Sequence, residues 1–561
     1  MPEYLTPGVY FRFQEQPPPI LGLRTDIAGF VGLAQRGPLN TPVPLYSWRQ
    51  FTEVFGDFLP CSYLAYAVQG FFANGGVTCY VVRVAGKTAA RAALTLKNQD
   101  GRPVMEILAK NEGAWGNQIA LSFQTRPRAG EFSLQVSLPG LGVERFSRLS
   151  LDPAAPWYAV INEGNGQTPA SQWIEAKVPE GGPAPDLPDA GQSGVGKNGL
   201  VNLAGGLDGH AALTMDDLLG DFDPLASSRR GLSALDAVEA VRIVAMPDMH
   251  LQPVVAPLAP PPWSEPLRDP CLPCQPPVAP ASPPPPEAAE QPPGFSTAEV
   301  LEIQAAMVEH CEQRRDRVAV LDAPCPGGRP LTAAEIQAWR ERFDSPRGFA
   351  ALYYPWIKVD DPLRLGANPL RAVPSCGHVT GIYARVDLST GVHGAPANLE
   401  LVGAQDVMAL INDEVQGVWN PQGVNCLRAF PGRGLRVYGA RTVSLDADWR
   451  YVNVRRLMLM IEDALDKSTQ WAVFEPHDYA LRQTLVQSVS SFLDAIWRRG
   501  ALVGETSAQA YYVKCDDTNN PPSEVDKGKI LVEIGVAPVH PAEFIVVNIE
   551  RTATGLEITE R

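Results

Sequence analysis

The spacing of apolar residues changes along the chain and predicts different structures in successive parts. From residue 21 to 85, short apolar strands alternate with one helical stretch around residues 62–72. From residue 86 to 205, apolar runs alternate with glycine, proline and asparagine turns, and the clearest runs are 104–108, 119–123 and 132–136. Short strands separated by turn residues are typical of an antiparallel β-rich unit.

From Gly231 onward the pattern becomes that of an α/β protein, in which three apolar strands alternate with two helices. The strands are residues 241–245, 318–321 and 349–354, and the helices begin at capping boxes that pair Ser296 with Glu299 and Thr332 with Glu335. This order predicts a largely parallel sheet with helices on its faces.

Two further helices near the C-terminus have an apolar stripe each. One stripe consists of Val454, Leu457, Ile461 and Leu465, and the other of Leu481, Leu485, Val489, Phe492 and Ile496. Stripes of this width predict that both helices pack on a core.

Each end of the chain carries a strand bounded by proline. The N-terminal strand includes Tyr4, Pro7, Gly8, Val9, Tyr10, Phe11 and Phe13, and the C-terminal one Pro541, Glu543, Phe544, Ile545, Val546, Val547 and Ile549. Proline cannot donate to a ladder, so both strands suit an edge position. Strands of this kind complete a sheet either in the same chain or in a neighbour.

A proline-rich segment from residue 252 to 293 interrupts the α/β pattern and predicts an extended surface loop. It contains the one close cysteine pair, Cys271 and Cys274. A zinc or redox site would need a second ligand pair or a strand-to-helix context, and the sequence offers neither. We expect an exposed dithiol in a tolerated loop; recruitment of a partner by the loop is the alternative.

Composition narrows the class of protein. A chain of 561 residues with 45% apolar and 19% charged residues has material for several globular domains. The net charge of −15 argues against a nucleic-acid binder. No stretch approaches a membrane span, and the N-terminus lacks the pattern of a signal peptide, so we expect cytoplasmic synthesis. Nine scattered cysteines fit reduced thiols.

The sequence gives no sign of a catalytic or nucleotide site. The hydrolase, zinc-protease and phosphate-loop motifs are missing. His310 is expected on the solvent side of its helix, and His378, His393 and His540 have no nucleophile at a recognised spacing. We therefore predict no catalytic residue, no cofactor and no metal. An α/β enzyme with a dispersed active site remains the alternative, and a surface-binding module in the β-rich segment is a third possibility.

Basic residues gather in two places. Arg428, Arg433, Arg436 and Arg441 form the densest stretch. They could face an acidic partner or belong to a solvated turn region, and both interpretations stay open. Arg498 and Arg499 end the last long helix, a position that favours cations without any partner.

Eight short motifs in register make the chain similar to contractile tail sheath proteins. In the first half they are YLTPGVYF (4–11), DIAGFVG (26–32), FTEVFG (51–56) and FFANGG leading to CYVVRV (71–84). In the second half they are NPQGVN (420–425), VYGART (437–442), WAVFEP (471–476) and APVHPAEF (537–544). The resemblance covers most of the chain.

The resemblance implies an α/β multidomain fold: a core with a mixed sheet, an inserted β-rich domain and a C-terminal sheath domain with extended strand arms. The expected divisions are an N-terminal arm (1–20), the core (21–85 and 206–370), the β-rich domain (86–205), the sheath domain (371–537) and a C-terminal arm (538–561). Arg498 and Arg499 are the expected contacts to an inner tube.

The function that the resemblance implies is structural. Subunits would stack as hexameric rings around an inner tube, and the sheath would contract by rearranging its interfaces to drive the tube through a target envelope. The arms would cross to neighbours and complete small sheets there. The expected partners are other copies of the chain, the inner tube protein, baseplate proteins and terminator or cap proteins, with no nucleic acid and no membrane insertion. A phage tail or released tail-like particle is the expected location.

Overall fold

The computed structural model describes residues 20, 22–126, 130–152, 156–165, 167–178, 187–189, 191–196, 199–221, 229–251, 290–363 and 369–543, and the backbone of 547–552 and 555–560. The N-terminal strand of the sequence prediction and the segment 252–289, including Cys271 and Cys274, lie outside these residues.

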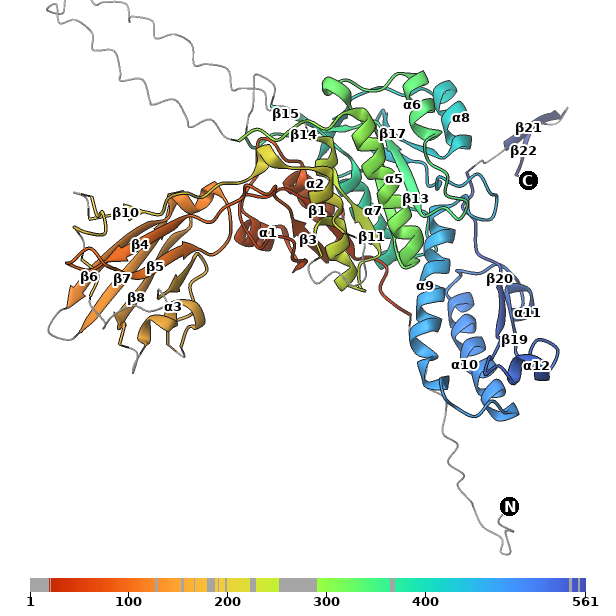
Figure 1. Ribbon diagram of the computed structural model, residues 1–561. Coiled ribbons are helices and arrows are strands. Elements are labelled where there is room, and N and C mark those ends of the chain that lie inside the picture. The colour runs from red at the N-terminus through yellow and green to blue at the C-terminus, as the bar shows by residue number, and fades with distance from the viewer. Residues whose placement is uncertain are drawn as a thin grey trace, which may run out of the picture.

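An eight-stranded sheet forms the centre of the molecule (Figure 1). Its order is β18-β17-β13-β12-β11-β1-β3-β2. The strands are β1 (Ala28–Gly32), β2 (Val43–Leu45), β3 (Cys79–Arg83), β11 (Ile243–Ala245), β12 (Val318–Asp322), β13 (Ala350–Tyr354), β17 (Val424–Phe430) and β18 (Gly434–Tyr438). The six inner strands are parallel, and the outer strands β2 and β18 are antiparallel to their neighbours. The predicted α/β core with a mixed sheet is confirmed.

Helices cover both faces of this sheet because its strands are apolar on both sides. Val31 and Val82 pack toward α5 (Thr297–Arg314) and α6 (Ala333–Arg340), whereas Phe30 and Val81 face α2 (Leu64–Ala73) and α7 (Cys376–Ser389). The short helices α1 (Trp48–Phe55) and α4 (Met215–Leu219) border the same two cores. Both predicted capping boxes are present, at Ser296 and at Thr332.

Two buried carboxylates fix where α2 and α7 begin. Asp322 accepts hydrogen bonds from Ser375 N at 2.7 Å, Ser375 Oγ at 2.6 Å and Cys376 N at 3.0 Å. Asp248 accepts from Leu33 N at 2.7 Å, Ser62 Oγ at 2.7 Å and Tyr63 N at 2.6 Å. Burial raises the pKa of Asp248 to about 6, against the effect of these donors.

A β-rich unit projects to one side of the core (Figure 1, orange). It has a three-stranded sheet of β4 (Ala93–Lys97), β5 (Pro103–Ala109) and β9 (Ile174–Lys177), and a four-stranded sheet of β10 (Val201–Asn202), β6 (Ala120–Arg126), β7 (Glu131–Leu138) and β8 (Gly142–Leu149). All pairings are antiparallel, as predicted, and the unit has its own apolar core between residues 92 and 203. The short helix α3 (Val160–Glu163) packs against β9.

The C-terminal unit consists of two long helices and a small sheet (Figure 1, blue). Its elements are α9 (Val452–Ser468), α10 (Tyr479–Arg498), α11 (Ser507–Ala510), β19 (Tyr511–Lys514), α12 (Pro522–Val525) and β20 (Glu533–Val536). The predicted stripes of α9 and α10 pack on one core, where Leu457 and Ile461 lie with Val489 and Phe492. The helix α8 (Asp413–Trp419) packs on the core of α5 and α6, and a sheet of β14 (Ile357–Asp360), β15 (Leu370–Val373) and β16 (Ala404–Val407) packs on the core of α2 and α7.

Candidate assembly surface

The small sheet of the C-terminal unit has an open edge. β19 and β20 are antiparallel, and no other strand among the described residues pairs with β20. Beside it lies a groove of about 880 Å³ between the end of α9, the start of α10 and residues 528–534. The groove is lined mainly by apolar side chains, including Leu465, Leu485, Val489, Ile530, Val532 and Ile534. An unpaired strand edge next to an apolar groove is a geometry that accepts a further strand.

The loop between α9 and α10 presents apolar residues to solvent at the rim of this groove. Phe474 is fully exposed, and Val473 and Tyr479 are also exposed. Phe474 has a φ of 71°, in the left-handed region that a residue with a bulky side chain rarely adopts. This loop contains the WAVFEP motif that carries part of the family resemblance. The exposed rings add apolar surface to the groove rather than to the core.

The two arm strands predicted at the ends of the chain are only partly within the described residues. Tyr4, Pro7, Gly8, Val9, Tyr10, Phe11 and Phe13 lie outside them, as do Phe544, Ile545 and Val546. The C-terminal strand in the structure is β21 (Val547–Thr552), which contains Val547 and Ile549 and forms an antiparallel hairpin with β22 (Gly555–Glu560). The sequence did not predict this hairpin.

The described residues next to the two predicted arms contact the folded body. On the N-terminal side, Ile20 and Leu23 pack against the core of α9 and α10. On the C-terminal side, Pro541 is half-buried, and Glu543 forms an ion pair with the Arg441 guanidinium, with Arg441 Nε 2.9 Å from Glu543 Oε1. The ion pair raises the pKa of Arg441. We call residues 22–26 and 539–543 the arm roots.

The basic residues of the sequence prediction divide into two groups. Arg428 donates to Asp413 at 2.6 Å and lies over the Phe430 ring, and Arg441 is buried against Glu543. These two are used within the chain. Arg433 is exposed and Arg436 is half-buried. Arg433 Nη2 donates to Asn398 Oδ1 at 2.9 Å, and Arg436 Nη1 donates to Asn398 O at 2.6 Å. Contact of Arg433 and Arg436 with an acidic partner stays a prediction.

Arg498 and Arg499 are exposed at the end of α10, as their position predicts. Arg498 lies 2.6 Å from Asp494 one turn earlier in the helix. Their role as contacts to an inner tube remains a prediction.

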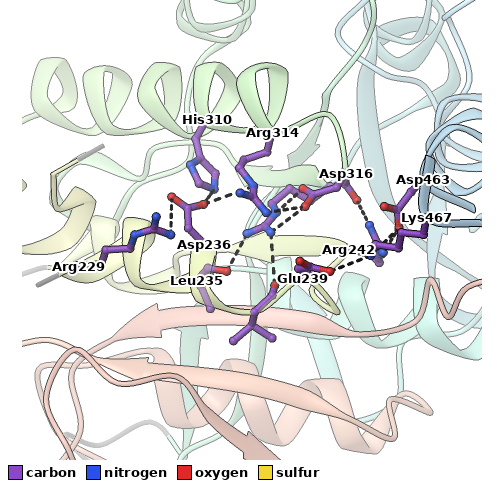
Figure 2. Close-up of polar contacts among 12 residues, drawn as sticks. Arg229, Leu235, Asp236, Glu239, Arg242, His310, Arg314, Asp316, Asp463 and Lys467 are labelled. Carbon is purple, nitrogen blue, oxygen red and sulfur yellow. Dashed lines mark hydrogen bonds and ion pairs between the residues drawn. The ribbon is translucent and has the colours of Figure 1, made fainter. Parts of the chain in front are cut away.

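The expectation for His310 is wrong. His310 is buried on α5, and its Nε2 lies 3.6 Å from Asp236 Oδ1 in a network with Arg229 and Arg314 (Figure 2). Burial lowers the pKa of His310 to about 3, so the ring is neutral at pH 7. The signal was present in the sequence, since Ile303, Met307 and His310 share one helix face by their spacing.

The same network continues from the sheet to the C-terminal unit (Figure 2). Arg317 pairs with Asp316 at 2.6 Å, and the backbone oxygen of Asp316 accepts from Arg242 at 3.1 Å. Arg242 in turn pairs with Asp463 of α9. The network therefore connects the α/β core with the helix that leads into the groove.

Other functional features are scarce in the described part of the chain. It has no helix long and apolar enough to cross a membrane, and no cluster of three potential metal ligands. Its seven cysteines are buried and in the reduced thiol form. His378 is buried between α7 and α2, where burial lowers its pKa to about 4. The arrangement defines a class of protein: a multidomain α/β chain whose small C-terminal sheet offers an open strand edge.

Comparison with known families is specific in the second half of the chain. Residues 293–443 match the family model "Phage tail sheath protein central domain", and residues 444–552 match "Phage tail sheath C-terminal domain". Residues 293–552 therefore consist of two domains of the phage tail sheath family.

Curated relatives agree with this assignment. The tail sheath protein of Burkholderia phage BcepMu is 30% identical over 254 residues, which cover 42% of this chain and 50% of the relative. The tail sheath protein of Vibrio phage KVP40 is 25% identical over 247 residues, covering 40% of this chain and 35% of the relative. The matched part thus spans half or less of each of these two relatives. Both are structural proteins, in line with the prediction that the chain is no enzyme.

Solved structures show that the fold extends over the whole chain. The sheath complex of the extracellular contractile injection system PVC, in its contracted state, is 18% identical with a TM-score of 0.53 and covers 99% of both chains. The contracted helical sheath of the anti-feeding prophage is 19% identical with a TM-score of 0.53 and covers 98% of this chain and 100% of the other. The match to a sheath tail protein from Listeria innocua has a TM-score of 0.55 at 12% identity and covers 96% of this chain and 95% of the Listeria chain.

Proposed function

We propose that this chain is a sheath subunit of a contractile injection machine, a phage tail or a tail-like particle. Copies of it stack as hexameric rings around an inner tube, with a baseplate at one end and a terminator or cap at the other. Contraction rearranges the contacts between copies and drives the tube through a target envelope. The domain limits given by the sequence, 1–20, 21–85 with 206–370, 86–205, 371–537 and 538–561, form part of the proposal.

The observation that supports the proposal most strongly is the open edge of β20 beside the apolar groove. In the assembly, strands from the terminal arms of neighbouring copies lie along this edge. Each backbone hydrogen bond so formed contributes only about 0.5–1.5 kcal/mol. Because every copy donates and accepts arms, the links form a continuous mesh. The folded bodies rotate within that mesh when the sheath contracts.

The energy for contraction is conformational in this proposal. The extended sheath is a metastable packing of rigid bodies, and contraction leads to better-matched interfaces while the arms stay engaged. No nucleotide, cofactor or metal takes part. Arg498 and Arg499, exposed at the end of α10, face acidic groups of the inner tube.

Truncation tests the proposal. Chains lacking residues 1–12, or residues 541–561, are expected to fold and to remain unable to form tubes, as judged by negative-stain electron microscopy with the full chain as control. The second truncation also removes the Glu543 ion pair, so circular dichroism must first establish that its helix content equals that of the full chain. Tubes of normal length from both truncated chains would refute the role of the arms.

A further inference from the structure

The N-terminal arm root is fixed by a buried ring of polar contacts. Arg456 of α9 donates from Nη1 to Asp387 Oδ1 at 2.9 Å, from Nη2 to Asp387 Oδ2 at 2.5 Å, and from Nη2 to the backbone oxygen of Thr25 at 2.9 Å. Thr25 Oγ1 donates to Asp387 Oδ2 at 2.6 Å. The Arg456 and Asp387 side chains are each 3% exposed. Residue 25 is therefore held by both its main chain and its side chain.

The C-terminal arm root is fixed at the same end of α9. Asn453 Nδ2 donates to the backbone oxygen of Val539 at 3.2 Å, and Val539 N donates to Ala501 O at 3.1 Å. The His540 ring lies 5.6 Å from that of Tyr451, the residue before α9. Glu543 then pairs with Arg441, which is joined to Tyr451 by a β-bridge. Asn453, Tyr451 and Arg441 tie this root to α9 and to the chain that leads into it, and Ala501 ties it to the chain that follows α10.

Asn453 and Arg456 are three residues apart in the first turn of α9, so they lie on the same face of the helix. One contacts the C-terminal root and the other the N-terminal root. Residues separated by more than five hundred positions in the sequence are thereby joined across a single helical turn. We propose that the first turn of α9 is a mechanical joint, through which a pull on one arm passes directly to the other arm.

This proposal rests on the proposed function, because the pull comes from neighbouring copies that hold the arms. It adds that tension crosses each subunit at the joint and does not run through the β-rich unit. The β-rich unit is then free of axial load while it rotates. The continuous element of the contracting sheath is a chain of arms and joints, to which the domains are attached.

Single-molecule pulling of the full chain, with handles at residues 1 and 561, tests the joint without assembly. Glu543→Gln removes the charge of the C-terminal root, and Thr25→Val removes the hydroxyl donor of the N-terminal root, each at nearly constant volume. Both are expected to shift the first rupture to lower force than in the unmodified chain. An unchanged first rupture in both variants would overturn the proposal.

Asp463→Asn is the matched control. Asp463 lies on the same helix and pairs with Arg242, with side chains 13% and 9% exposed, close to the 16% and 8% of Glu543 and Arg441. It contacts neither arm root, so its first rupture should occur at the force of the unmodified chain. A shift as large as that of Glu543→Gln would show that loss of a buried ion pair outside the arm roots has the same effect, and would overturn the joint.

Sheaths assembled on the inner tube give the second readout. After triggered contraction, Glu543→Gln and Thr25→Val sheaths should be recovered in fragments, whereas unmodified and Asp463→Asn sheaths should be recovered whole. Whole sheaths from both root variants would contradict the joint. If the unmodified chain forms no sheath at all, the proposed function fails, and the pulling experiment still decides whether the first turn of α9 connects the two roots.

Discussion

The ion pair between Arg456 and Asp387 permits a quantitative test of how the C-terminal unit is held to the core. Arg456→Gln would leave the Asp387 carboxylate 3% exposed, with the Thr25 hydroxyl as its remaining donor from this cluster. Removal of one partner of a buried pair costs about 3–5 kcal/mol, since the other charge stays desolvated. Because the Thr25 hydroxyl still donates to Asp387, we expect the free energy of unfolding to fall by about 3 kcal/mol, at the lower end of this range.

The double variant Arg456→Met with Asp387→Leu separates the cost of a lone charge from the value of the pair. Two apolar side chains of similar volume remove the buried charge altogether, and such replacements are often close to neutral. The Thr25 hydroxyl and carbonyl then lose their partners, at about 1 kcal/mol each. We expect the double variant to be less stable than the unmodified chain by about 2 kcal/mol, and more stable than Arg456→Gln alone.

Urea unfolding followed by tryptophan fluorescence measures these differences. The control is Arg49→Gln, which breaks an exposed pair with Glu53, where the side chains are 87% and 57% exposed. That pair should contribute less than about 0.5 kcal/mol. We would reject this estimate if Arg456→Gln lowered the free energy of unfolding by no more than Arg49→Gln does, or if the double variant were less stable than Arg456→Gln alone.

Three further perturbations follow from local contacts. Burial raises the pKa of Asp248 to about 6, above the value of about 3.9 in an unfolded chain, so the stability that the protonated carboxyl contributes is complete below pH ~4 and is lost as the pH rises through 6. The urea midpoint of the unmodified chain, relative to that of Asp248→Asn, should therefore fall as the pH rises across this window. A difference that does not change with pH would contradict the prediction. Gly377→Ala would bring a Cβ to 2.2 Å from Ala67 O, so the free energy of unfolding from urea titration should fall by about 1–3 kcal/mol, which outweighs the gain of about 1 kcal/mol in helix propensity. An unchanged free energy of unfolding would mean that α2 and α7 separate without cost. Phe474→Ala should leave the thermal unfolding temperature unchanged, because the ring is fully exposed. The substitution should reduce the number of tubes counted by electron microscopy. A normal number of tubes would show that Phe474 is not part of the assembly surface.

Local signals in the sequence were enough to predict the elements of the α/β core. The capping boxes at Ser296 and Thr332 mark where helices begin. Apolar runs near them, such as Val318–Asp322, are shorter than a typical helix and apolar almost throughout, which is typical of buried strands. The order of the strands could not be predicted. β1 pairs with β11 although more than two hundred residues separate them, and no local pattern encodes a pairing of that range.

The sequence predicts only part of the arm roots. Glu543 lies in the C-terminal motif and is therefore predicted as an arm residue, whereas Asp387, Asn453 and Arg456 lie in no motif. Asn453 and Arg456 flank the apolar stripe of α9 and look like residues at the border of a buried face. Their partners are main-chain oxygens of residues 25 and 539, and a sequence does not reveal which carbonyl a side chain will reach.

The central claim, that copies of this chain are linked by strands added at β20, is tested most directly by cryo-electron microscopy of tubes assembled with the inner tube protein. The account predicts hollow, helically ordered tubes in which a strand from a neighbouring copy runs along the free edge of β20, and in which residues 22–26 and 539–543 keep the contacts described above. Tubes in which that edge stays empty, or in which each arm folds back onto its own subunit, would contradict the account.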